Sequence, residues 1–167
     1  MESVEFSIAQ QTDAAAIARV HIRTWQTAYA TLLSKEYLEA LNETQRYQWW
    51  LQILATPNHG VFVVKIKQEV VGFISVGPAE GHSGSAEVYA FYILEEAQRS
   101  GYGNALWQMA RQWLSKQGYQ SLVLWVLKEN PSVAFYIKQG GQQQHIKPVT
   151  IGGTTLDEVC YAFQLTK

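Results

Sequence analysis

The sequence predicts one mixed α/β domain, and three observations support this fold class. First, an aromatic and β-branched run at residues 86–93 is typical of a strand, and a glycine-bearing turn and apolar residues at helical spacing follow it as far as Gly118. Second, another apolar run, residues 121–127, predicts a buried strand after this helix. Third, six or seven strand-like segments occur with about four helical ones. The central strand, helix and strand should therefore form a parallel, right-handed crossover in one mixed sheet.

The other elements follow from local signals taken in chain order. Thr12 or Asp13 can cap a first helix, and Pro57 ends an aromatic one. Before the central strand we expect a strand at residues 4–9, helices at 13–25, 34–41 and 47–54, a hairpin of strands 61–66 and 69–76, and a loop at 77–85. After the buried strand, Pro131 starts a further helix, and strands at residues 142–149 and 156–165 are joined through Gly152 and Gly153.

Composition limits the classes of protein and partner. Hydrophobic residues make up 47% of the 167 residues and charged residues 16%, which predicts a globular chain, with residues 1–167 forming one domain. The formal net charge is −1 without a basic cluster, so nucleic acid and membranes are not expected partners, and a homodimer is left open. The single cysteine, Cys160, and the lack of a signal-peptide pattern or a long apolar run favour a cytoplasmic protein.

The turn before the central helix predicts a phosphate site. Gly101 and Gly103 stand where that helix begins, and the first N–H groups of a helix have no partner within it. No Lys-Ser or Lys-Thr pair follows these glycines, so the turn is not a nucleotide-binding Walker loop. The third glycine and the acidic residue of a dinucleotide-binding fingerprint are also missing. The ligand should nevertheless carry phosphate.

The pattern Gln98-x-x-Gly101-x-Gly103 resembles the acetyl-coenzyme A pyrophosphate loop of the GNAT superfamily of N-acetyltransferases. The run from Asn130 through Ala134, Phe135 and Tyr136 to Gly140 is similar to the family segment that closes the coenzyme cleft, although one residue shorter between Asn130 and Tyr136. The first helices, with Trp25 and Tyr29, are similar to those of one bacterial branch. The resemblance implies a GNAT fold, with a mixed six- to seven-stranded sheet and a splayed central strand pair.

The resemblance also implies where acetyl-coenzyme A, the expected cosubstrate, would bind. The main chain of Phe91, Tyr92 and Ile93 should pair with its pantetheine arm, as an added strand would. The side chain of Asn130 should reach that arm from the opposite strand end. The pyrophosphate would lie on the loop made of Gln98, Arg99, Ser100, Gly101, Tyr102 and Gly103.

Acetyl transfer to an amine requires two proton transfers. The amine arrives as an ammonium and must lose a proton, and the departing thiolate leaves faster when an acid protonates it. Tyr136 matches the family's tyrosine acid. Glu87 is the best candidate for the base, because it stands eleven residues before Gln98, where one branch of the family places its base; a water relay is the alternative. Trp125 occupies the position on the buried strand where some relatives carry a glutamate, so that residue offers no base here.

Other residues are assigned to the acceptor or to the core. Trp25, Tyr29 and His82 are candidates for the acceptor pocket, because the first helices form its wall in this fold and His82 lies in the loop before the central strand. The four histidines show no metal-ligand spacing with one another or with Cys160, so no metal is expected. His21, at helical spacing from Trp25, and Cys160 are expected to be packed.

Three functions remain open from the sequence. The first is an acetyl-coenzyme A dependent N-acetyltransferase that acts on a primary amine of a small molecule or of a protein N-terminus, by direct attack in a ternary complex. The second is a coenzyme A-binding sensor or structural module without turnover. The third is an acyltransferase with another acyl donor, because the loop contacts pyrophosphate and pantetheine and not the acyl group.

Overall fold

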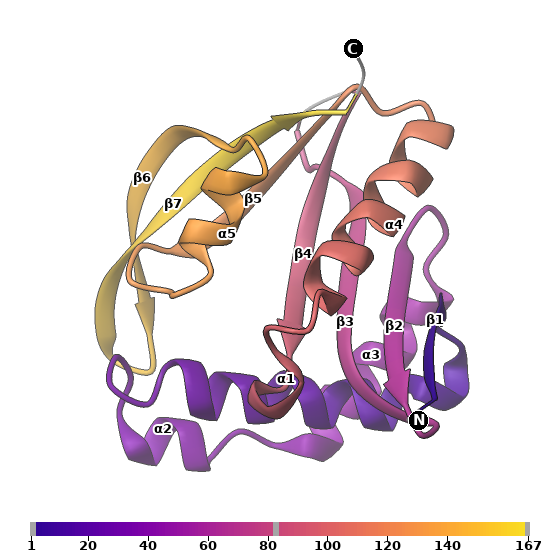
Figure 1. Cartoon of the computed structure of the whole chain (residues 1–167). Helices are drawn as coiled ribbons and strands as arrows, with labels where there is room; N and C mark the ends of the chain where they lie inside the picture. Colours follow the sequence, from indigo (N-terminus) through magenta and orange to yellow (C-terminus); the bar gives the residue numbers. More distant parts are fainter. Residues whose placement is uncertain (1–2, 82–83, 166–167) are drawn as a thin grey trace.

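The computed structural model describes residues 3–81 and 84–165. Its strands form a single seven-stranded sheet in the order β1-β2-β3-β4-β5-β7-β6 (Figure 1). The strands are β1 Val4–Ile8, β2 Gly60–Ile66, β3 Glu69–Pro78, β4 Ser85–Ile93, β5 Ser121–Leu127, β6 Gln142–Ile151 and β7 Thr154–Gln164. The five α-helices of the described residues are α1 Ala14–Ala28, α2 Lys35–Glu39, α3 Glu43–Ala55, α4 Tyr102–Lys116 and α5 Val133–Lys138.

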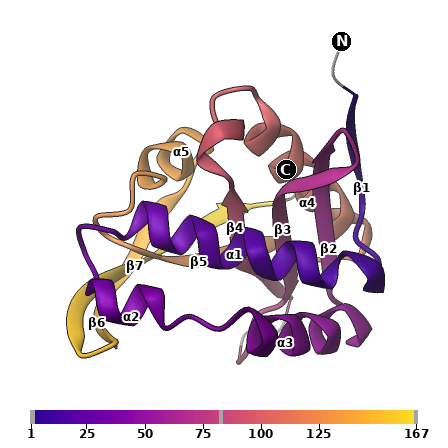
Figure 2. The ribbon, with the colours of Figure 1, turned by 90° about the horizontal axis from the view of Figure 1, so that it is seen from below.

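The helices cover both faces of the sheet. In Figure 2, α1, α2 and α3 lie on one face, whereas α4 and α5 lie on the other. One core cluster therefore joins α4 and α5 to the sheet through Leu106, Trp107 and Tyr136, and a second cluster joins α1 and α3 to the opposite face through Ile17 and Trp50. The predicted elements are confirmed in type and order, with five helices in place of about four.

β4 and β5 are paired only over part of their length. They run parallel, as predicted, but their pairing covers only residues 85–88 and 121–124. All the other neighbouring strands of the sheet are antiparallel. Beyond Val88 the two strands diverge toward α1, as Figure 1 shows below the point where they meet. The expected splayed central pair is thus confirmed.

A β-bulge at Tyr89 lies where the two strands separate. Ser75 of β3 is opposite Ala90 and Val76 is opposite Val88, so Tyr89 is the extra residue. A bulge bends its strand and reverses the alternation of side chains. Val88 and Phe91 consequently belong to the core on the α4 side of the sheet, whereas Ala90 and Tyr92 pack toward α1. The bulge thereby turns the Tyr92 ring toward the first helix.

The hairpin between β6 and β7 closes the far end of the opening. Its turn, Gly152-Gly153, approaches α2 so closely that a Cβ atom on Gly152 would lie 2.3 Å from the Tyr37 ring. Leu127 at the end of β5 packs with Tyr29, Leu33 and Leu38 in a small third core cluster. The helical segment before β2 is therefore fixed against the C-terminal strands.

Candidate active site

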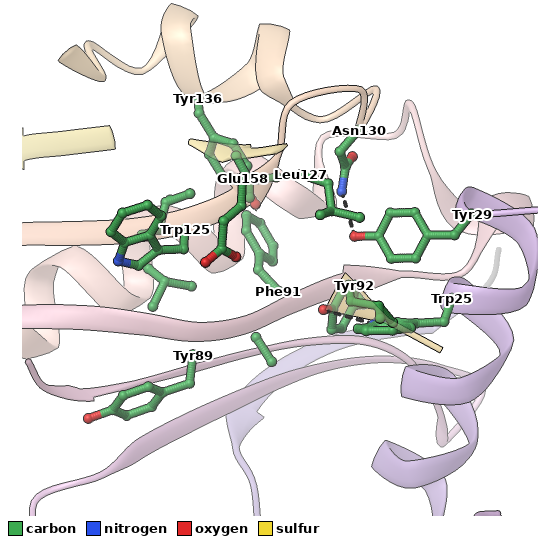
Figure 3. Close-up of a pocket in the computed structure, with 15 residues that line it drawn as sticks. Trp25, Tyr29, Tyr89, Phe91, Tyr92, Trp125, Leu127, Asn130, Tyr136 and Glu158 are labelled. Atoms are coloured by element: carbon green, nitrogen blue, oxygen red, sulfur yellow. Dashed lines mark hydrogen bonds between the residues drawn. The ribbon is translucent and has the colours of Figure 1, made fainter. Parts of the chain in front are cut away.

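A cavity of about 170 Å³ occupies the opening between β4 and β5. Side chains from α1, from both strands, from the loop after β5 and from α5 to β7 line it (Figure 3). The lining residues used below are Trp25, Tyr29, Tyr89, Phe91, Tyr92, Trp125, Leu127, Asn130, Tyr136 and Glu158. Because the cavity lies where the sheet has lost its pairing, main-chain groups and side chains both border it.

Tyr136 points from α5 into this cavity, as Figure 3 shows. Its side chain is 6% exposed, and its ring centroid lies 5.9 Å from that of Trp107 and 6.4 Å from that of Phe91. Burial, and to a smaller extent the nearby oxygens of Tyr92 and Tyr29, raise the pKa of Tyr136 above its usual value. The phenol therefore stays protonated at neutral pH. The shortened segment after Asn130 still brings it to the cavity.

Tyr29 and Asn130 join the two ends of the opening. The Asn130 side-chain amide donates to the Tyr29 hydroxyl over 2.9 Å, and its oxygen accepts from the backbone N–H of Ser132 over 2.7 Å. Burial raises the pKa of Tyr29, so its hydroxyl also remains protonated. Asn130 thus holds the Tyr29 hydroxyl in place, and one N–H of its amide remains for a further partner.

Tyr92 and Trp25 form a second pair of this kind. The Trp25 indole N–H donates to the Tyr92 hydroxyl over 3.0 Å, and burial raises the pKa of Tyr92. Behind Tyr92 the His21 ring stacks at 5.1 Å between centroids and accepts from Trp50 through Nδ1, which confirms His21 as a packed residue. A tyrosine oxygen that accepts from an N–H keeps its own O–H proton for another acceptor.

Glu158 is a cavity residue that sequence reasoning missed. It lies on β7, and its carboxylate points into the cavity in Figure 3, close to Trp125. It is the only charged side chain among the described residues that line this cavity. We call Trp25, Tyr29, Tyr92, Trp125 and Glu158 together the side-chain wall. The only signal in the sequence was a carboxylate within an otherwise apolar strand run, Glu158-Val-Cys-Tyr-Ala-Phe163.

Glu87, the sequence-based candidate for the base, is not among the residues that line the cavity. It lies at the closed end of the opening, where β4 pairs with Gly77 of β3 and Val123 of β5. Tyr89, which does line the cavity, lies within reach of its charge: burial first, and then Glu87, raise the pKa of Tyr89 to about 12. The catalytic role of Glu87 stays a prediction.

The loop segment, residues 91–103, leads from the cavity to the start of α4. Gly101 precedes α4 with φ of 82°, a left-handed conformation, and a Cβ atom there would meet nothing within 4 Å. The N–H groups of Tyr102, Gly103 and Asn104 have no helical carbonyl four residues before them. These donors and the open space above Gly101 suit a phosphate group.

The other predicted coenzyme residues have mixed surroundings. The Gln98 amide donates to the Ile93 carbonyl over 2.9 Å, so this side chain holds the loop to the end of β4. Arg99 and Ser100 are exposed, and Arg99 has a positive φ of 65°. Phe91, Tyr92 and Ile93 pair with β3 on one side only, since β5 has separated from them on the other. The strand edge that faces the opening is therefore available to a ligand.

The remaining sequence-based expectations concern two residues, His82 and Cys160, and two absences. His82 lies outside the described residues. Within residues 3–81 and 84–165, no group of three or more His, Cys, Asp or Glu side chains could hold a metal ion. In the same residues no helix is long and apolar enough to cross a membrane. Cys160 is buried on β7, as expected for a packed residue.

Known proteins are similar to this chain in sequence. A sequence profile described as "Acetyltransferase (GNAT) family" matches residues 20–140. An uncharacterized N-acetyltransferase of Bacillus subtilis, YuaI, is 36% identical over 148 residues, which cover 86% of this chain and 83% of that protein.

Solved structures agree in fold. The PaiA N-acetyltransferase of Thermoplasma acidophilum, in complex with coenzyme A, matches with a TM-score of 0.74 and 20% identity over 93% of this chain and 98% of its own. A putative acetyltransferase of Salmonella typhimurium, yncA, with its cofactor acetyl-CoA, matches with a TM-score of 0.77 and 19% identity over 99% and 95% of the two chains. The profile match over residues 20–140 and the 36% identity to YuaI show that the chain belongs to the acetyltransferase (GNAT) family.

Proposed function

We propose that this protein transfers the acetyl group of acetyl-coenzyme A to a primary amine of a small molecule or of a protein N-terminus, within a ternary complex. One observation carries the proposal: a protonated tyrosine, Tyr136, points into a cavity between two splayed strands, and the loop segment leads from that cavity to a helix N-terminus suited to phosphate. Membership of the family and the two coenzyme-bound structural relatives support it.

The residues present fit the coenzyme. The open space above Gly101 and the free N–H groups of the first turn of α4 would hold the pyrophosphate. The edge of residues 91–93 that no strand pairs with would hold the pantetheine arm as an added strand. The remaining N–H of the Asn130 amide would donate to the same arm from the other side of the opening. When bound, acetyl-coenzyme A supplies an acetyl group activated as a thioester.

The chain's own residues would manage the protons. Tyr136 holds a proton on its hydroxyl at neutral pH and can give it to a developing anion in the cavity. Backbone N–H groups on the open edge of β4 can stabilise an oxyanion. A carboxylate or a water relay must take the proton of the incoming ammonium, with Glu87 as the sequence-based candidate. Tyr29 and Tyr92 offer O–H donors to a polar group of the acceptor.

A donor and acceptor panel tests the proposal. The purified protein is incubated with acetyl-coenzyme A and, separately, with polyamines, amino acids, aminoglycosides or peptide N-termini, and products are detected by mass spectrometry. We expect an acetylated amine from at least one class, with Tyr136→Phe as the matched inactive control. Coenzyme A binding without any product would favour the sensor or structural module, and turnover only with a longer acyl donor would favour another acyltransferase.

A further inference from the structure

An ammonium group is already bound beside the cavity, and it belongs to the chain itself. Lys147 on β6 lies directly opposite Glu158 on β7. Its Nζ atom lies 3.6 Å from Oε1 of Glu158 and 4.2 Å from the centre of the Trp125 ring. A carboxylate combined with the face of an indole is a chemical arrangement that binds alkylammonium groups.

Both groups that hold this ammonium also line the cavity, whereas Lys147 does not. The Glu158 side chain is 20% exposed and that of Lys147 is 56% exposed. The lysine therefore reaches the site from the solvent, while the carboxylate and the indole are also accessible from the cavity. Among the described residues that line the cavity, no positive charge competes for Glu158.

Lys147 can leave at low cost, because ion pairs with a half-exposed partner contribute little to stability. The indole does not depend on it for its position. The His145 ring stacks on Trp125 at 6.4 Å between centroids and 18° between planes, and Trp125 is half-buried within β5. The site would keep its carboxylate and its ring if another cation replaced the lysine.

We infer that Glu158 and Trp125 bind a second positively charged group of the acceptor, and that Lys147 occupies this place until the acceptor enters. This inference rests on the proposed function and narrows its substrate class to amines with a second ammonium group. β5 and the opening itself separate Glu158 on β7 from β4, so the two ammonium groups of the acceptor must lie at the ends of a chain that crosses the opening. Glu158 and Trp125 would then be specificity-determining residues.

The test compares two amines that share a four-carbon chain and differ in the second amino group. Steady-state kcat/KM for acetylation is measured with putrescine and with n-butylamine, for the wild type and for Glu158→Gln. We expect the wild type to prefer putrescine, and Glu158→Gln to reduce this preference by about tenfold or more, since a hydrogen bond to a charged partner is among the stronger ones. The kcat/KM for n-butylamine should change little.

A second pair of variants tests whether Lys147 competes with the acceptor for Glu158 and Trp125. Lys147→Met removes the competing ammonium and should lower the KM for putrescine by about two- to fivefold, because the binding-competent form is then populated more fully. Lys35→Met is the matched control, because Lys35 pairs with Glu39 at a similar 3.7 Å and does not line the cavity between β4 and β5. It should leave the KM unchanged.

The outcomes separate this inference from the function on which it rests. An equal loss for both amines in Glu158→Gln would mean that Glu158 serves the reacting amine, and would overturn the inference while acetylation stands. An unchanged preference would overturn it as well. If no amine is acetylated, the proposed function fails, and calorimetric titration of putrescine into the coenzyme A complex still decides the inference: tight binding lost in Glu158→Gln supports it, and equal binding contradicts it.

Discussion

The loop segment and the side-chain wall border the same opening, but they are assembled differently. The loop segment is continuous in sequence, and its proposed ligand contacts are backbone N–H and C=O groups at residues 91–103. The side-chain wall draws Trp25 and Tyr29 from α1 and its C-terminal cap, Tyr92 from β4, Trp125 from β5 and Glu158 from β7, and it places the hydroxyls of Tyr29 and Tyr92 in the cavity. A backbone site suits a ligand shared by a whole family, whereas side chains can change with the acceptor.

Tyr136 lies between these two regions, and its loss should have the largest effect. Tyr136→Phe keeps the ring that packs on Trp107 but removes the proton donor. We expect kcat to fall by ~10²–10⁴-fold while the Kd for acetyl-coenzyme A stays nearly unchanged. Single-turnover kinetics and calorimetry give the two quantities. Full kcat with chemistry shown to be rate-limiting would mean that water or another residue supplies the proton.

The loop segment is tested by charge at Gly101. In Gly101→Glu a carboxylate would occupy the space above the α4 N-terminus and repel phosphate, so the Kd for acetyl-coenzyme A should rise by about 10- to 100-fold. Gly118→Glu is a matched control, because Gly118 also has a positive φ, 93°, and open space around its Cβ position, but at the other end of α4. Equal affinities in the two variants would remove the loop from the site.

The stability of the protein should also depend on pH, through His21, whose ring stacks on Tyr92 of the side-chain wall. Burial, and then the charge of Arg46, lower the pKa of His21 to about 3, whereas the unfolded chain has the usual value near 6.5. Between these two pKa values, His21 is protonated in the unfolded state and neutral in the folded state. Stability should therefore fall by about 1.4 kcal/mol per pH unit as pH decreases from 6.5 toward 3.

Chemical denaturation at several pH values measures this slope. His21→Asn keeps an acceptor for the Trp50 indole N–H but cannot titrate, so its stability should lose this component of the pH dependence. Parallel pH profiles of the variant and the wild type would show that another group causes the acid sensitivity.

The smallest effect is expected for Glu87. Because Glu87 lies outside the cavity lining, Glu87→Gln should change kcat/KM by only about two- to threefold, uniformly across pH, as in an enzyme that deprotonates its amine through water. A selective loss at low pH, with part of the acidic limb of the profile removed, would instead identify Glu87 as the base. The pH profile of kcat/KM distinguishes the two results.

The same contrast explains what could be predicted from the sequence. The central strand, the glycine turn and α4 are local patterns, so the sequence alone predicts the parallel pair and the candidate phosphate site. The contact between Tyr29 and Asn130 joins residues 101 positions apart, and no local pattern contains it. Glu158 lines the cavity because the register of β7 places it opposite Leu127 of β5, and this register is a long-range property.

The bulge at Tyr89 was a further unpredicted feature. An alternating strand from Val88 onward would place Ala90, not Phe91, on the α4 side, and nothing in the aromatic run Val88-Tyr-Ala-Phe-Tyr92 marks the extra residue. The extra residue depends on the pairing with Ser75 and Val76 of β3, which is a long-range property. It decides which of the tyrosines in β4 points toward α1.

The most direct test of the account is a crystal structure of the protein with coenzyme A. We expect the sulfur atom to lie in the cavity between β4 and β5, within hydrogen-bond reach of the Tyr136 hydroxyl, at about 3.5 Å or less. The pantetheine arm should pair with the main chain of residues 91–93, and the pyrophosphate should contact the N–H groups after Gly101. A sulfur outside this cavity, or a coenzyme bound without the loop segment, would contradict the account.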